Sequence, residues 1–189
     1  MKKDLDYNLI RCINHLIDGN VILYPTDTIW GLGCDATNAE AVDRIFEIKQ
    51  RPANKSLIVL VDSIATLERH VNVTNEIESL IFSLKVPTTI IYPNPLGLAK
   101  NVINEDNTVA IRLVKHKFCQ QLIREFGKPI ISTSANISGE KTPLQFGQIS
   151  SEIKDKVDFI VERKHDTSSY QQPSKLIKIN KDNSIEYLR

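Results

Sequence analysis

The chain has 189 residues and is 41% hydrophobic, which is enough to bury one substantial core and predicts a single domain over residues 1–189. Lysine and arginine number 24 against 23 acidic residues, so the net charge of +1 gives no global reason for tight binding to nucleic acid. The three cysteines and four histidines lack zinc-ligand spacing and no apolar run approaches the ~20 residues of a membrane span, so we expect a reduced cytoplasmic protein without a membrane partner.

Hydrophobic spacing predicts helices and strands that alternate along the chain. The predicted helices share apolar residues every three or four positions and lie at residues 5–17, 37–51, 65–70, 75–85 and 118–126. The predicted strands are short apolar or β-branched runs at residues 21–24, 57–61, 88–92, 108–113, 129–132, 175–179 and 184–188, with a further apolar run at 157–161. The last two strands surround a polar turn, which indicates an antiparallel pair. This order predicts an α/β domain with a mixed sheet.

Local signals set the helix ends. Asp18-Gly19-Asn20 ends the first predicted helix, Thr37 and Glu40 have the spacing of a capping box that begins the second, and Gly127 ends the fifth. The polar segment 163–173 carries no regular apolar anchors. It is interpreted either as a plain surface loop or as a lid.

The first cluster with chemical meaning is Lys49-Gln50-Arg51-Pro52-Ala53-Asn54-Lys55, which places three cations between a predicted helix and a predicted strand. Arginine offers a planar fork of donors and lysine a compact charge, a combination suited to phosphates. The sequence lacks the P-loop motif and a complete dinucleotide fingerprint. The alternative is that these cations merely offset the helix dipole and remain solvated.

Two further groups of polar residues follow predicted strands. Ser132-Thr133-Ser134-Ala135-Asn136 places hydroxyls and an amide at a strand end, where open α/β sheets bind ligands, although serine and asparagine also simply form turns. Arg112 stands between Ile111 and Leu113 in a strand that should be buried on at least one face. An unpaired cation is costly there, so Arg112 needs either a ligand anion or an internal acid.

Taken together, these motifs resemble the YrdC/TsaC family over nearly the whole chain. The resemblance rests on four segments in the family's order and spacing: Tyr24-Pro-Thr-Asp-Thr-Ile-Trp-Gly-Leu-Gly33, Lys49-x-Arg51-Pro52, Thr108-Val-Ala-Ile-Arg112 and Ser132-Thr-Ser-Ala-Asn136. Trp30 occupies a position that more often holds tyrosine or phenylalanine. The resemblance implies a single YrdC-like domain, with a twisted mixed sheet and a concave basic face.

The resemblance also implies an activity, namely L-threonylcarbamoyladenylate synthesis. L-threonine, bicarbonate or CO2, and ATP would give threonylcarbamoyl-AMP and pyrophosphate. The product would pass to the downstream tRNA threonylcarbamoyl transferase complex for the t6A37 modification of tRNA, with at most weak contact between this chain and tRNA. ATP is a substrate, and we expect Mg2+ to be held mainly by its phosphates, because no acidic cluster resembling a metal site is visible in the sequence.

Residue roles follow from matching positions in the family's motifs. The resemblance assigns Lys49 and Arg51 to catalysis at the phosphates. ATP binding is assigned to Lys49, Arg51, Lys55, Thr108, Ser134, Asn136, Thr142 and Arg189. Threonine binding is assigned to Thr28, Arg112, Ser132 and Ser174, and Arg112 is the natural partner of the threonine carboxylate. We therefore expect Arg112 to face the ligand and not an internal acid.

Two other functions remain alternatives at this point. Relatives with this fold are linked to double-stranded RNA binding, for which a concave basic face would suit an A-form backbone. A related carbamoyl-transfer activity belongs to the YrdC-like domain of the hydrogenase-maturation carbamoyltransferase, but that larger protein adds cysteine-rich and acylphosphatase parts. The near-neutral net charge disfavours the RNA alternative.

Overall fold

In the computed structural model, the described residues are 6–52, 55–168, 170–180 and 184–188. They form a nine-stranded sheet in the order β7-β1-β2-β6-β3-β5-β4-β8-β9. The strands are β1 (Ile22–Tyr24), β2 (Gly31–Gly33), β3 (Ile58–Val61), β4 (Thr88–Pro93), β5 (Thr108–Leu113), β6 (Ile130–Ser134), β7 (Phe159–Ile160), β8 (Lys175–Ile179) and β9 (Ile185–Tyr187).

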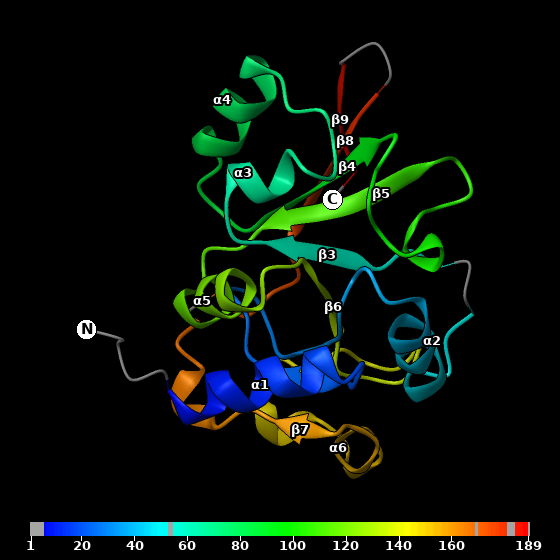
Figure 1. The fold of residues 1–189 in the computed structure, drawn as a ribbon, viewed down its shortest axis with the longest axis vertical. Helices are drawn as coiled ribbons and strands as arrows, with labels where there is room; N and C mark the ends of the chain where they lie inside the picture. The colour runs from blue at the N-terminus through cyan, green and yellow to red at the C-terminus, as the bar shows by residue number, and fades with distance from the viewer. Residues whose placement is uncertain (1–5, 53–54, 169, 181–183, 189) are drawn as a thin grey trace.

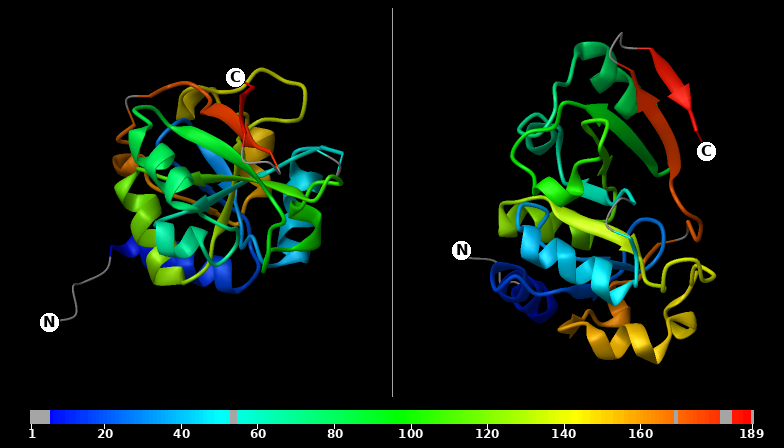
Figure 2. Two further views of the ribbon diagram at one scale, coloured as in Figure 1. Left: turned by 90° about the horizontal axis from the view of Figure 1, so that it is seen from above. Right: turned by 90° about the vertical axis from the view of Figure 1, so that its right-hand side faces the viewer.

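Parallel and antiparallel neighbours alternate irregularly across this sheet. The pairs β1/β7, β3/β5 and β4/β8 are parallel, and the other neighbours are antiparallel. The predicted α/β domain with a mixed sheet is therefore confirmed, as is the antiparallel pairing of the last two predicted strands. The right panel of Figure 2 shows the β8–β9 hairpin on the side of the molecule away from the N-terminus.

The helices lie close to their predicted positions. They are α1 (Tyr7–Ile17), α2 (Ala39–Ile48), α3 (Ile64–Leu67), α4 (Asn75–Ser83), α5 (Lys117–Phe126) and α6 (Ser151–Lys156), with short 3-10 turns η1 (Lys100–Val102), η2 (Phe146–Gln148) and η3 (Arg163–His165). Figure 1 shows α3 and α4 at one end of the sheet and α6 with β7 at the other. Across the described part of the chain, none of these helices has the length and apolar character needed to cross a bilayer.

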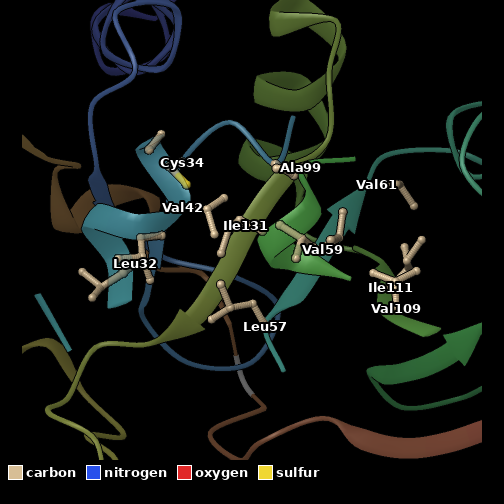
Figure 3. Packing of buried hydrophobic residues seen from close by; sticks show 14 of the residues in the cluster. Leu32, Cys34, Val42, Leu57, Val59, Val61, Ala99, Val109, Ile111 and Ile131 are labelled. Carbon is tan, nitrogen blue, oxygen red and sulfur yellow. The ribbon is translucent and has the colours of Figure 1, made fainter. Parts of the chain in front are cut away.

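Two hydrophobic clusters hold the helices on the sheet. In one, Leu9 and Leu16 of α1 pack with Leu122 of α5 around Leu60 and Ile130 of the sheet. The other, larger cluster joins α2, α3 and α4 to the central strands. Figure 3 shows Val42 of α2 beside Ile131 and Val59 in this cluster. Burial of these apolar side chains is the main force that fixes the strand order.

The helix ends show where local signals act. Gly127 ends α5 in the left-handed conformation, with φ of 81°, as its position predicts. The capping box expected at Thr37 and Glu40 is wrong, because Asn38 is the N-cap and accepts from the backbone N–H groups of Glu40 and Ala41. The Thr37 hydroxyl donates instead to Asp35, at 2.6 Å. A nearby buried carboxylate thus competes successfully for the threonine.

Strand β2 and helix α6 were missed by sequence reasoning. Two of the three β2 residues are glycines, which have low strand propensity and no hydrophobic pattern. Gly33 nevertheless cannot carry a side chain, because an added Cβ would lie 2.5 Å from the Tyr24 ring and 2.7 Å from the carbonyl oxygen of Ile131. Close packing between β1 and β6 therefore requires a glycine at this position.

Candidate functional site

Alternation along the central strands divides their side chains between core and cavity. Val59, Ile111 and Ile131 point into the larger hydrophobic cluster. Their sequence neighbours Ile58, Ala110, Arg112 and Ser132 line a cavity of about 380 Å³. Because successive side chains of a strand point to opposite faces, burying one set presents the other set to the ligand.

The four residues assigned to threonine lie together in this cavity. Thr28 from the β1–β2 connection, Arg112 from β5, Ser132 from β6 and Ser174 before β8 all contribute to its lining. The Thr28 hydroxyl lies 2.9 Å from that of Thr26, and the Ser174 hydroxyl lies 2.8 Å from that of Thr89. The chain thus brings hydroxyls from three parts of the sequence around one arginine.

Arg112 does have an internal acidic partner. Its Nη2 lies 3.1 Å from Oδ1 of Asp27, and both side chains are buried, at 3% and 7% exposure. The contact lacks hydrogen-bond geometry, and Arg112 Nη2 donates instead to the Thr28 hydroxyl at 3.4 Å. Arg112 Nε and Asp27 Oδ1 have no hydrogen-bond partner among the described residues. The expectation that Arg112 faces only the ligand is therefore wrong. The acid belongs to the Thr-Asp-Thr motif and is visible in the sequence. Its contact with Arg112 could not be predicted, because it depends on the path of the β1–β2 connection.

Lys49 is not a solvated helix-end cation. It is 1% exposed, and its Nζ donates to the carbonyl oxygens of Ser134 and, at 2.7 Å, Asn136. Burial, and secondarily the charge of Arg51, lowers the pKa of Lys49 to about 7. Lys49 does not line the cavity itself but fixes the backbone of the loop that does. Its replacement should therefore affect folding, which would not be the case for a solvated cation at the end of a helix.

Arg51 and Lys55 have different surroundings. Arg51 lines the cavity, and its Nη2 donates to the Ser56 carbonyl oxygen at 2.6 Å. Burial lowers the pKa of its guanidinium. Its Nε is buried without a hydrogen-bond partner among the described residues. Lys55 is exposed and is not part of the lining.

The remaining residues assigned to ATP are dispersed. Ser134 and Thr142 line the cavity. The Asn136 amide donates to the carbonyl oxygens of Ile137 and Glu140, so it shapes the loop after β6. Thr108 lines a shallow groove that adjoins the cavity, since Ser56 and Ile91 line both, and its hydroxyl donates to Asp106 at 2.6 Å. Arg189 lies outside the described residues.

The segment 163–173 is tied to the cavity by polar contacts that sequence reasoning missed. The Trp30 indole N–H donates to Asp166 at 2.7 Å, and the Thr167 hydroxyl lies 3.1 Å from Nε2 of His116. Trp30 itself lines the cavity. The sequence of this segment lacks regular apolar anchors, which suggested a lid or a plain loop. The hydrogen bonds explain this pattern, because polar side chains hold the segment in place. No cluster of three or more potential metal ligands occurs in the described parts of the chain.

The fold and the cavity define an α/β protein in which two arginines and several hydroxyl groups line one cavity. Residues 14–189 match the profile of the Sua5/YciO/YrdC family, whose description is telomere recombination. The chain belongs to this family. It is 38% identical to a threonylcarbamoyl-AMP synthase from Pseudoalteromonas translucida over 82% of this chain and 84% of that one. A Vibrio cholerae protein of the same name is 34% identical, with 89% and 91% covered.

A solved structure extends these comparisons. P. abyssi Sua5 complexed with L-threonine superimposes with a TM-score of 0.78 and 28% sequence identity, over 90% of this chain. The chain spans half the length of that Sua5 chain. The superposition confirms the family fold.

We expect Arg112→Ala to destabilise the protein by about 3–5 kcal/mol, because Asp27 would remain as a buried charge without a partner. Urea unfolding of the variant and of wild type measures the loss. The double variant Asp27→Asn/Arg112→Ala leaves no stranded charge and should recover part of it. Equal stability of the single variant and wild type would show that the ion pair contributes nothing.

Lys49 should make stability depend on pH in a defined direction. Its pKa falls from 10.5 to about 7 on folding, so between these values the unfolded chain binds a proton that the folded chain has released. The free energy of unfolding should then rise with pH, relative to Lys49→Met, by at most about 1.4 kcal/mol per pH unit. Urea unfolding across this range measures the difference, and exposed Lys117→Met is the control. A difference independent of pH would contradict the shift.

Proposed function

We propose that the protein is an L-threonylcarbamoyladenylate synthase, which forms threonylcarbamoyl-AMP and pyrophosphate from L-threonine, bicarbonate or CO2, and ATP. The observation that carries the proposal is the shared cavity, in which Arg51 and Arg112 lie among hydroxyl groups. Relatives that carry this name and cover most of the chain support it. P. abyssi Sua5, solved with L-threonine, supports threonine as the amino-acid substrate.

The reaction needs an amine, a carboxylate and a phosphate chain held together. The uncharged amine of threonine attacks CO2 and loses a proton, giving a carbamate. A carbamate oxygen then attacks the α-phosphorus of ATP, and the bond to pyrophosphate breaks. Charge is redistributed among phosphate oxygens throughout, so catalysis rests on positioning and on fixed positive charge.

The cavity residues divide between the two substrates. Arg112 would bind the threonine carboxylate, with Thr28, Ser132 and Ser174 around the rest of the amino acid. Arg51 would bind the phosphates, because its guanidinium faces the cavity without an acidic partner among the described residues. Charge-assisted hydrogen bonds from arginine are suited to both anions.

The remaining nucleotide-binding assignments follow the family's motifs. Ser134 and Thr142 would contact the nucleotide from the cavity wall, and Thr108, Asn136 and Arg189 keep their assigned roles as proposals. Lys49 would act at the phosphates from beneath the loop that follows β6. An approaching phosphate would raise its pKa, since a nearby negative charge favours the protonated amine.

The setting of the reaction is also part of this proposal. Mg2+ would be bound mainly by the phosphate oxygens of ATP and would offset their charge. We place the enzyme in the cytoplasm, where its product would pass to the tRNA threonylcarbamoyl transferase complex for t6A37 modification. Any contact between this chain and tRNA would be weak, given a net charge of +1.

We expect pyrophosphate release to require ATP, L-threonine and bicarbonate together. A coupled pyrophosphate assay with each amino acid in turn, with and without bicarbonate, measures this requirement. Equal release with another amino acid, or without bicarbonate, would remove the proposed activity. Tight binding of duplex RNA at physiological salt without any pyrophosphate release would favour an RNA-binding function instead.

Arg51→Ala should lower kcat/KM by roughly tens to thousands of times, since it removes one preorganised charge from the phosphates. The melting temperature should change little, because among the described residues the side chain is tied to one carbonyl oxygen and has no acidic partner to strand. Exposed Arg69→Ala is the matched control for loss of a positive charge. Full activity in the Arg51 variant would mean that this arginine does not act on ATP.

A further inference from the structure

The two cavity arginines differ in how their charges are balanced. Arg112 is paired with the buried carboxylate of Asp27 at 3.1 Å. Arg51 contacts only a carbonyl oxygen, that of Ser56, and has no acidic partner among the described residues. The cavity is therefore close to neutral at Arg112 and positive at Arg51.

The two arginines also act on different parts of the cavity. Arg51 is tied to Ser56, just before β3, whereas Arg112 lies opposite Leu60 in the β3–β5 register. These backbone positions are four residues apart along the segment that leads into β3, which is about 13 Å for extended chain at a rise of ~3.3 Å per residue. The two arginines are therefore anchored at different places along the cavity wall.

Asp27 is held firmly in place behind Arg112. Its Oδ2 accepts a hydrogen bond from the backbone N–H of Lys115 at 3.1 Å, so the carboxylate is fixed by the chain that follows β5. Its Oδ1 faces Arg112, and Asp27 is not among the residues that line the cavity. A ligand would therefore meet Arg112 directly and would feel the charge of Asp27 through it.

We propose that Asp27 is the specificity-determining residue of this cavity, because its charge makes the Arg112 end accept a zwitterionic amino acid and reject phosphate chains. The inference rests on the proposed function, since it assigns the two ends of the cavity to the two substrates. Asp27 would thereby select between the two substrates without contacting either of them.

The physical reason is the net charge of each ligand. The carboxylate of an amino acid gains from Arg112, and the negative charge of Asp27 behind it reduces the repulsion between Arg112 and the ammonium group, so the pair tolerates a zwitterion. A phosphate chain carries several negative charges and no positive one. Near this pair its attraction to Arg112 is offset by repulsion from Asp27, which leaves its loss of hydration uncompensated. The phosphate chain would then bind at Arg51.

Removing the charge of Asp27 should open the Arg112 end to phosphate. We expect inorganic pyrophosphate to leave the threonine dissociation constant of wild type unchanged in calorimetric titrations. In Asp27→Asn, saturating pyrophosphate should weaken apparent threonine binding by about tenfold or more, as like-charge rejection is lost. Asp27→Glu, which keeps the charge, should behave as wild type. So should Asp35→Asn, which neutralises a buried acid paired with Lys128 outside the cavity.

A second titration does not depend on threonine. Arg51→Ala should bind pyrophosphate poorly, and Arg51→Ala/Asp27→Asn should bind it about tenfold or more tightly than Arg51→Ala does, at the Arg112 end. Adding Arg112→Gln should abolish this gain. If Asp27→Asn fails to fold, Asp27→Ser removes the same charge with a smaller side chain and is read in the same way.

The results of these titrations distinguish a failure of the proposed function from a failure of the role proposed for Asp27. Wild type that binds no threonine and releases no pyrophosphate would remove the proposed function, while the pyrophosphate titrations would still report on Asp27. Threonine binding in Asp27→Asn that is as insensitive to pyrophosphate as in wild type would overturn the role of Asp27 and leave the proposed function intact. Competition by pyrophosphate in wild type itself would overturn it as well.

Discussion

The two-residue alternation of β-strands is the constraint on which this cavity depends. In β5, Val109 and Ile111 must be buried in the core, and this places Ala110 and Arg112 on the cavity side. A shift of one residue in the register would exchange the two sets. The hydrophobic residues therefore determine the position of Arg112 as firmly as any contact that the arginine itself makes.

Two buried cations in this structure are stabilised in different ways. Lys49 is surrounded by carbonyl oxygens, and burial lowers its pKa, so the cost of its charge is partly avoided by loss of a proton. The guanidinium of Arg112 is balanced instead by the buried carboxylate of Asp27. A bound anion can therefore restore the positive charge of Lys49. Arg112 and Asp27, in contrast, form a pair of opposite charges without net charge.

Local sequence predicted the strands and most helices because their hydrophobic periods are regular. It could not find β2, in which Gly31 and Gly33 carry no pattern, or the Asn38 cap, which depends on Asp35 drawing Thr37 away. The motif residues Thr28, Ser132 and Ser174 were expected at one site, and they do line one cavity. The Asp27–Arg112 ion pair could not be predicted, because the partners are 85 positions apart and meet only through the strand order.

The strand order also has a consequence for how the chain folds during synthesis. Ile22 pairs with Phe159, and Thr89 pairs with Leu176, so β1 and β4 each wait for a partner strand that is made much later. Closing such long loops costs chain entropy before any contact compensates for it. We therefore expect the cavity, which takes Thr28 and Ser174 from distant parts of the chain, to be completed only after β8 has emerged from the ribosome. Until then β1 and β4 each have an unpaired edge, and chaperone binding there would protect the nascent chain from aggregation.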